Sequence, residues 1–143
     1  MTNKDAVRTD GGTDRRYKIG QALLAVAAIA TAAVFIGGFT IVARAPDDRI
    51  WVEIWRTTAY GVFAGLFALL AHAPRSQRAI WALVFGQKLT LVIFGALVGD
   101  VNEARRATVV DFGLVVILVT SFILCRSWYA WRPRARSSGS LAG

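Results

Sequence analysis

The sequence predicts an all-α integral membrane protein, arranged as an up-down bundle of four helices. Two observations lead to this prediction. Hydrophobic residues make up 55% of the 143 residues, with a mean hydropathy of +0.48, and most charged residues gather in the tails and short connectors. A helix needs about 20 residues to cross a hydrocarbon core about 30 Å thick. Four apolar stretches are about that long: residues 19–43, 50–73, 79–99 and 108–125.

The first stretch, residues 19–43, is expected to be a retained anchor and not a cleaved signal peptide. Its apolar run exceeds the usual length of a signal sequence, and Pro46 would directly follow the cleavage site. Pro46 and Asp47 instead mark the start of the helix at 50–73, because proline and acidic residues favour a first helical turn. Trp51 lies where an aromatic belt meets the lipid headgroups.

The other two connectors are also short and polar. Pro74 marks a tight basic turn before residues 79–99, and the mixed-charge sequence DVNEARR precedes residues 108–125. Connectors this short require neighbouring helices to run antiparallel. The apolar runs are too long, and alternate too little, for the strands of an outer-membrane barrel.

Basic residues are distributed unequally between the two sides of the membrane. The net charge is +8, and most lysine and arginine residues fall in the tails, 1–18 and 126–143, and in the turn before residue 79. The positive-inside rule therefore places both termini in the cytoplasm, an N-in/C-in topology. We expect tail 1–18 to be disordered and residues 132–143 of the basic tail 126–143 to be flexible, whereas Trp128, Tyr129 and Trp131 close the fourth helix at the inner interface. Both are expected to contact anionic lipid headgroups of the bilayer and not nucleic acid.

Composition also limits the cellular compartment and the kinds of disulfide, metal and catalytic chemistry that we expect. The excess of arginine over lysine, with abundant alanine, indicates a bacterial genome, and we expect the cell (inner) membrane. Cys125 is the only cysteine, so no intrachain disulfide can form. It suits a small buried residue, with acylation as the alternative. His72 has no second ligand at metal-binding spacing, and no nucleophile–base pair or cofactor motif is present. We therefore expect no metal and no cofactor, and the sequence disfavours an enzyme.

Lys88, beside Gln87, lies about midway through residues 79–99. A central lysine opposes insertion of a helix by about 2.5–3.5 kcal/mol, whereas the Leu, Ile, Phe and Val residues of this stretch favour it by about 3–7 kcal/mol in total. The helix can therefore carry Lys88 into the membrane without an ion pair.

Two pairs of glycines predict helix-packing surfaces. Gly95 and Gly99 follow Lys88 on nearly the same line of the helix, and Gly61 and Gly65 form a similar pair in the preceding helix. Small residues four apart let another backbone approach closely. Lys88 is therefore expected to face the bundle interior, with snorkelling toward an interface as the alternative.

Asp111 is the obvious counter-ion for Lys88, but side-chain direction argues against a direct pair. Side chains lean toward the N-terminus of their own helix. Since the two helices run in opposite directions, the side chains of Lys88 and Asp111 should diverge. The alternative is that Asp111 is an ordinary acidic residue in the first turn of residues 108–125.

A second polar line runs along residues 50–73. Glu53 and Tyr60 lie on one stripe, and Arg56 is spaced to pair with Glu53. With Asp111 and Lys88, these side chains could line an outward-facing polar pocket. The alternative is an interfacial ion pair beside a belt tyrosine.

The sequence EIWRTTAYG, which contains Glu53, Arg56, Tyr60 and Gly61, opens the second helix, and a basic turn and an acid opening the fourth helix follow. In this organisation, residues 19–125 resemble the DoxX-like four-helix bacterial membrane proteins. The resemblance implies a fold and no single activity.

Two functions follow as hypotheses. The first is a non-enzymatic protein that acts through helix–helix contacts, as a homo-oligomer or as an accessory subunit of a larger membrane complex. The second is a transporter or small-ligand binder, in which Lys88 attracts an anion or a quinone headgroup and Arg56, Tyr60 and Asp111 complete the site.

Overall fold

The computed structural model describes residues 4–98 and 102–131, and this part of the chain is helical with no strand. The elements are α1 (Lys4–Val42), α2 (Ile50–His72), α3 (Arg78–Val98), α4 (Asn102–Leu124) and the short 3-10 helix η1 (Ser127–Trp131). Each of the four α-helices contains a segment long and apolar enough to cross a membrane. The prediction of an all-α chain with four such helices is therefore confirmed.

The helix boundaries agree with the sequence for α2 and α3 but differ for the outer two helices. α1 begins at Lys4, so residues 4–18 are helical where we expected a disordered tail. α4 begins at Asn102, six residues before the expected start at 108. Hydropathy detects only the part of a helix that suits lipid, whereas Ala, Arg, Lys and Glu propagate a helix beyond it. An ion pair of 2.8 Å between Asp14 and Lys18, one turn apart, supports the extension of α1.

A short helix follows α4 at the start of the C-terminal tail 126–143. η1 contains Trp128, Tyr129 and Trp131, which we expected to close the fourth helix, and residues 132–143, which we expected to be flexible, lie outside the described residues.

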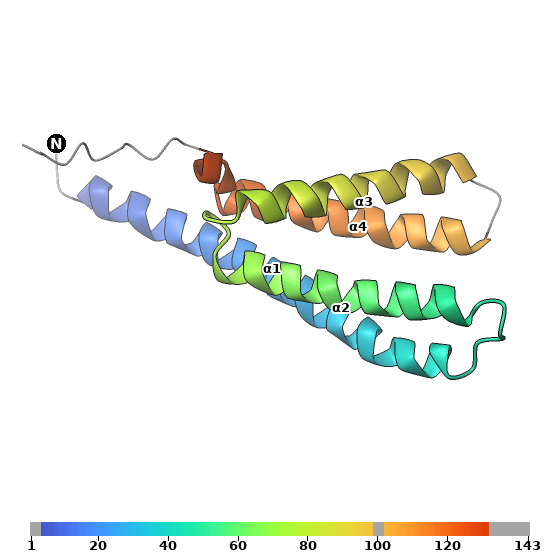
Figure 1. Ribbon diagram of the computed structural model, residues 1–143. Coiled ribbons are helices and arrows are strands. Elements are labelled where there is room, and N and C mark those ends of the chain that lie inside the picture. The colour runs from blue at the N-terminus through green and yellow to red at the C-terminus, as the bar shows by residue number, and fades with distance from the viewer. Residues whose placement is uncertain (1–3, 99–101, 132–143) are drawn as a thin grey trace, which may run out of the picture.

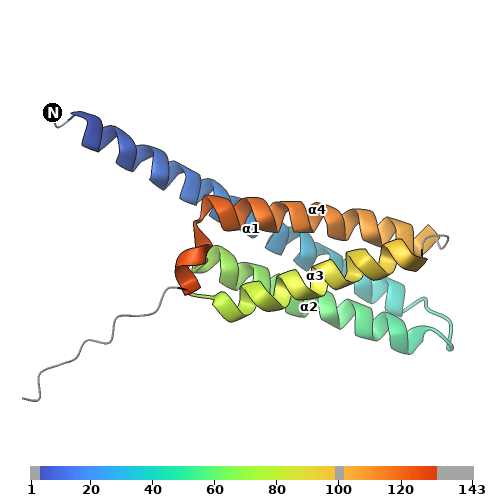
Figure 2. The ribbon, with the colours of Figure 1, turned by 90° about the horizontal axis from the view of Figure 1, so that it is seen from above.

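The four helices form two antiparallel hairpins, α1–α2 and α3–α4 (Figures 1 and 2). α1 also packs on α4, whereas α2 and α3 share few contacts. Figure 1 shows the two hairpins close together at the end of the α2–α3 connector and farther apart toward the α1–α2 connector. The N-terminal part of α1 projects beyond the bundle in both views.

The apolar core lies in the half of the molecule next to the α2–α3 connector. All four helices contribute to it, with the fully or nearly fully buried residues Leu24, Ala27, Ala28, Phe67, Leu70, Trp81, Val84 and Leu118. Among the described residues nearer the α1–α2 connector, the buried side chains are polar instead, and include Glu53, Thr57, Lys88 and Asp111. The buried polar residues of the candidate site therefore lie in this second half of the molecule.

Hydrogen bonds from side chains to the backbone stabilise the end of the bundle that contains the apolar core. The Trp81 indole Nε1 donates to the Pro74 carbonyl oxygen at 2.8 Å, and Arg75 Nε donates to the Cys125 carbonyl oxygen at 2.8 Å. The Arg75 guanidinium also lies 4.5 Å from the centre of the Tyr17 ring. These contacts tie α1, the α2–α3 connector, α3 and the end of α4 together at one point.

Candidate functional site

Lys88 and Asp111 form a direct ion pair between α3 and α4. Lys88 Nζ donates to Asp111 Oδ1 at 2.6 Å, and the two residues are only 5% and 8% exposed. The ammonium group also lies 4.9 Å from the centre of the Phe63 ring on α2. Lys88 thus faces the bundle interior, and our expectation that side-chain direction would keep it from Asp111 is wrong.

The register of the α3–α4 hairpin explains the pair. Lys88 lies ten residues before the end of α3 at Val98, and Asp111 lies nine residues after the start of α4 at Asn102. At about 1.5 Å per residue, both Cα atoms lie roughly 14 Å from the connector, so they share one depth. The flexible four-carbon stem of lysine then outweighs the lean of the two Cα–Cβ bonds. Asp111 is also in the third turn of α4, so it is not a first-turn acid.

Pairing changes what Lys88 can do chemically. Each of these charges alone would oppose insertion at the centre of a helix by about 2.5–3.5 kcal/mol. Together they offset each other, provided that the geometry stays close. The Lys88 ammonium group bonds to the Asp111 carboxylate and contacts the Phe63 ring, so it holds α2, α3 and α4 together. It is therefore not presented to a ligand.

Gln87 is half-buried next to this pair. Its amide Oε1 is buried and accepts no hydrogen bond from the residues that the structure describes. The sequence placed Gln87 with Lys88 in one candidate pocket, but no described contact joins the Gln87 side chain to the Lys88–Asp111 pair.

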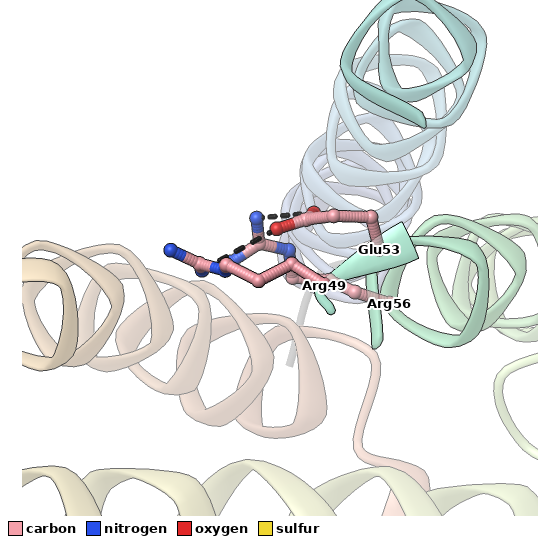
Figure 3. A network of polar contacts seen from close by, with 3 residues as sticks. All are labelled: Arg49, Glu53 and Arg56. Atoms are coloured by element: carbon pink, nitrogen blue, oxygen red, sulfur yellow. Dashed lines mark hydrogen bonds and ion pairs between the residues drawn. The ribbon is translucent and has the colours of Figure 1, made fainter. Parts of the chain in front are cut away.

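A second polar group lies near the start of α2. The Glu53 carboxylate accepts from Arg56 at 2.5 Å and from Arg49 at 3.5 Å, and Glu53 is 5% exposed (Figure 3). Figure 3 shows both guanidinium groups beside the Glu53 carboxylate; Arg56 lies on α2, and Arg49 is the residue that precedes α2. The sequence analysis proposed the pairing with Arg56 and missed Arg49, although Arg49 precedes Glu53 by four residues, a spacing that also favours an ion pair.

These arginines line a cleft at the α1–α2 connector. The cleft has a volume of about 490 Å³ and is formed by Thr40, Ile41, Arg44, Ala45, Pro46, Arg49, Glu53 and Arg56. Of the residues proposed for an outward-facing pocket, Glu53 and Arg56 line this cleft, whereas Tyr60, Lys88 and Asp111 do not.

The two polar groups are well separated along α2. Phe63, which covers Lys88, follows Glu53 by ten residues, or about 15 Å of helix. Tyr60 is half-buried between the two levels. The structure thus divides the proposed pocket into a surface cleft and a buried ion pair.

The four glycines proposed for helix packing have different surroundings. A Cβ at Gly61 would lie 3.1 Å from the Phe35 ring of α1, and a Cβ at Gly95 would overlap the Thr108 hydroxyl of α4. These two glycines therefore mark close helix contacts inside the chain. Gly65 has nothing within 4 Å of such a Cβ, and Gly99 lies outside the described residues.

A further close contact, at Gly38, was not predicted. A Cβ at this position of α1 would lie 2.7 Å from the side chain of Thr57 on α2. The approach of α1 and α2 beside the cleft depends on that small residue.

Comparison with known proteins adds no assignment. No protein-family model matches the chain, and no curated protein or solved structure is significantly similar to it. Within the described residues, no group of three or more His, Cys, Asp or Glu side chains could hold a metal ion.

Proposed function

We propose that this chain is a multi-pass protein of the bacterial cell (inner) membrane that acts through helix–helix contacts. It would work as a homo-oligomer or as an accessory subunit, with both termini in the cytoplasm. The observation that supports this proposal is the buried Lys88–Asp111 pair, because it engages the mid-membrane charges in contacts between helices.

The outer surface of the bundle is consistent with this role. Large apolar side chains are exposed on all four helices, as expected for surfaces that meet lipid or another membrane helix. Gly65 on α2 lies at this surface with open space beside it. A small residue there would let a helix of a second chain approach closely.

The alternative, a transporter that uses Lys88, Arg56, Tyr60 and Asp111 together, has less support. Arg56 lies in the cleft, whereas Lys88 and Asp111 are paired at the level of Phe63, seven residues or about 10 Å farther along α2. The kinship with DoxX-like proteins stays a proposal that rests on the same residues and on the four-helix organisation.

A paired substitution distinguishes the two functions. Lys88→Met together with Asp111→Leu removes both charges, so no charge is left unpaired in the interior. We expect the variant, purified in mild detergent, to keep the mass of the wild-type particle and any protein that copurifies with it. If reconstituted wild-type protein conducts ions or binds a ligand and the double variant does not, the contact-based function is wrong.

The proposed orientation has its own test. Reporter domains that are active only in the cytoplasm, or only outside it, are fused to each terminus of the full chain. The positive-inside bias predicts cytoplasmic reporter activity at both ends. An external C-terminus would overturn the N-in/C-in topology.

A further inference from the structure

The cleft at the α1–α2 connector is rich in arginine. Its lining carries three guanidinium groups, from Arg44, Arg49 and Arg56, and one carboxylate, from Glu53. The remaining lining side chains are uncharged. The lining itself has an excess of positive charge that favours an anion there, since Asp47 and Asp48 of the same connector are not among the lining residues.

The arginines are held at the cleft in two different ways. Glu53 is buried and pairs with Arg56 of α2 and with Arg49, the residue before α2, so one carboxylate orients two guanidinium groups. Arg44 comes from the connector that follows α1, and forms no ion pair with any residue that the structure describes. Arg44 is therefore a lining guanidinium that no carboxylate of the described residues engages.

The position of the cleft indicates the source of an anion. Trp51 and Trp55 lie on the first two turns of α2, beside the cleft residues, and are 69% and 68% exposed. Exposed tryptophans of membrane helices concentrate at the level of the lipid headgroups. Ile41 adds an apolar wall on α1. The cleft therefore lies where phosphate groups of lipids meet water.

We propose that this cleft binds a phosphate group, either of an anionic phospholipid headgroup or of a soluble phosphate. The planar fork of a guanidinium matches phosphate oxygens with two parallel hydrogen bonds, which a lysine cannot reproduce. The volume of about 490 Å³ is within the range of small-ligand sites. This site is separate from the proposed helix–helix function and depends only on the membrane location of the bundle.

The test uses the full chain, purified in a neutral detergent and titrated with three probes. These are short-chain phosphatidylglycerol, the diacylglycerol with the same acyl chains, and inorganic phosphate. Arg44→Gln removes the connector guanidinium, and Arg105→Gln is the matched control, an exposed arginine at the same end of the bundle that does not line the cleft. Arg44→Lys keeps the charge but not the fork.

We expect phosphatidylglycerol to bind and diacylglycerol not to bind. Arg44→Gln should weaken phosphatidylglycerol binding about tenfold or more, Arg44→Lys should have an intermediate effect, and Arg105→Gln should have almost none. Inorganic phosphate that binds as tightly as the lipid, with the same dependence on Arg44, would identify a soluble phosphate as the ligand. Tighter binding of the lipid would identify the headgroup.

Three results would overturn the proposal. Equal weakening by Arg44→Gln and Arg105→Gln would indicate only general attraction to a basic surface. Binding of diacylglycerol as tight as that of phosphatidylglycerol would exclude recognition of phosphate. Absence of binding for both phosphate-containing probes would exclude the site, provided that thermal unfolding shows the wild-type protein to be folded.

Discussion

Substitution of Lys88 by Met is the most informative perturbation of this fold. It removes the ammonium group that bonds to Asp111 at 2.6 Å and covers the Phe63 ring, while it keeps an unbranched side chain of similar length. Asp111 would then be a carboxylate that is 8% exposed and has lost its partner. The expected consequence is a loss of stability without a change in helix content.

The magnitude follows from the burial of the pair. Removing one member of a buried ion pair costs about 3–5 kcal/mol in water-soluble proteins, and loss of the contact with Phe63 adds about 0.5–2 kcal/mol. In the variant, the Asp111 carboxylate also lacks its partner in the detergent-denatured state. Because this part of the cost is common to the folded and denatured states, we expect the free energy of unfolding to fall by only about 3 kcal/mol. Replacing both members, with Asp111→Leu added to Lys88→Met, should restore most of the stability, because no buried charge remains unpaired.

Unfolding in mixed micelles with increasing sodium dodecyl sulfate, followed by circular dichroism, measures these differences. Wild type, both single variants and the double variant form a cycle that isolates the coupling between Lys88 and Asp111. Equal unfolding midpoints for wild type and Lys88→Met would refute the conclusion that the pair joins α3 to α4. A double variant as unstable as the sum of the two single variants would refute it too.

Three further predictions concern other parts of the bundle. Gly95→Leu should unfold at lower denaturant than wild type because its side chain would overlap α4, whereas Gly65→Leu should keep the unfolding midpoint and reduce only the mass of any oligomer. Arg75→Ala should lower the free energy of unfolding by about 1 kcal/mol through the lost hydrogen bond to the Cys125 carbonyl oxygen. Arg78→Ala, at a second exposed arginine, should change it little, and equal effects of the two substitutions would contradict this prediction. Burial raises the pKa of the Cys125 thiol, although Arg75 lowers it, so a maleimide should modify the folded chain more slowly at pH 8 than the detergent-unfolded chain. Because the folded pKa is raised, the thiol stabilises the fold below about pH 8.5 and that contribution is lost as the pH rises further.

The sequence predicted the helices at 50–73 and 79–99 to within about one residue of α2 and α3. It predicted the outer two helices less well, because helix formation continues beyond the apolar run wherever strong helix formers follow. The ion pair between Glu53 and Arg56 could be expected because it is local to one helix.

Side-chain direction led us to disfavour the Lys88–Asp111 pair, although a better signal was present. The two residues lie at nearly equal distances in sequence from residue 100, near the middle of the connector. In an antiparallel hairpin, such residues share one depth in the membrane. Register was therefore a better guide to this contact than the lean of the Cα–Cβ bonds.

The sequence alone determined that four apolar helices are joined by short connectors, because hydropathy and helix length depend on neighbouring residues of one segment. Only the tertiary structure decided which polar residues form the buried ion pair and which line the surface cleft. The rotation and register of four helices bring Lys88 to Asp111, separate both from Arg56, and place Arg44 beside α2. Contacts between helices depend on this mutual placement, which no spacing within a single helix contains.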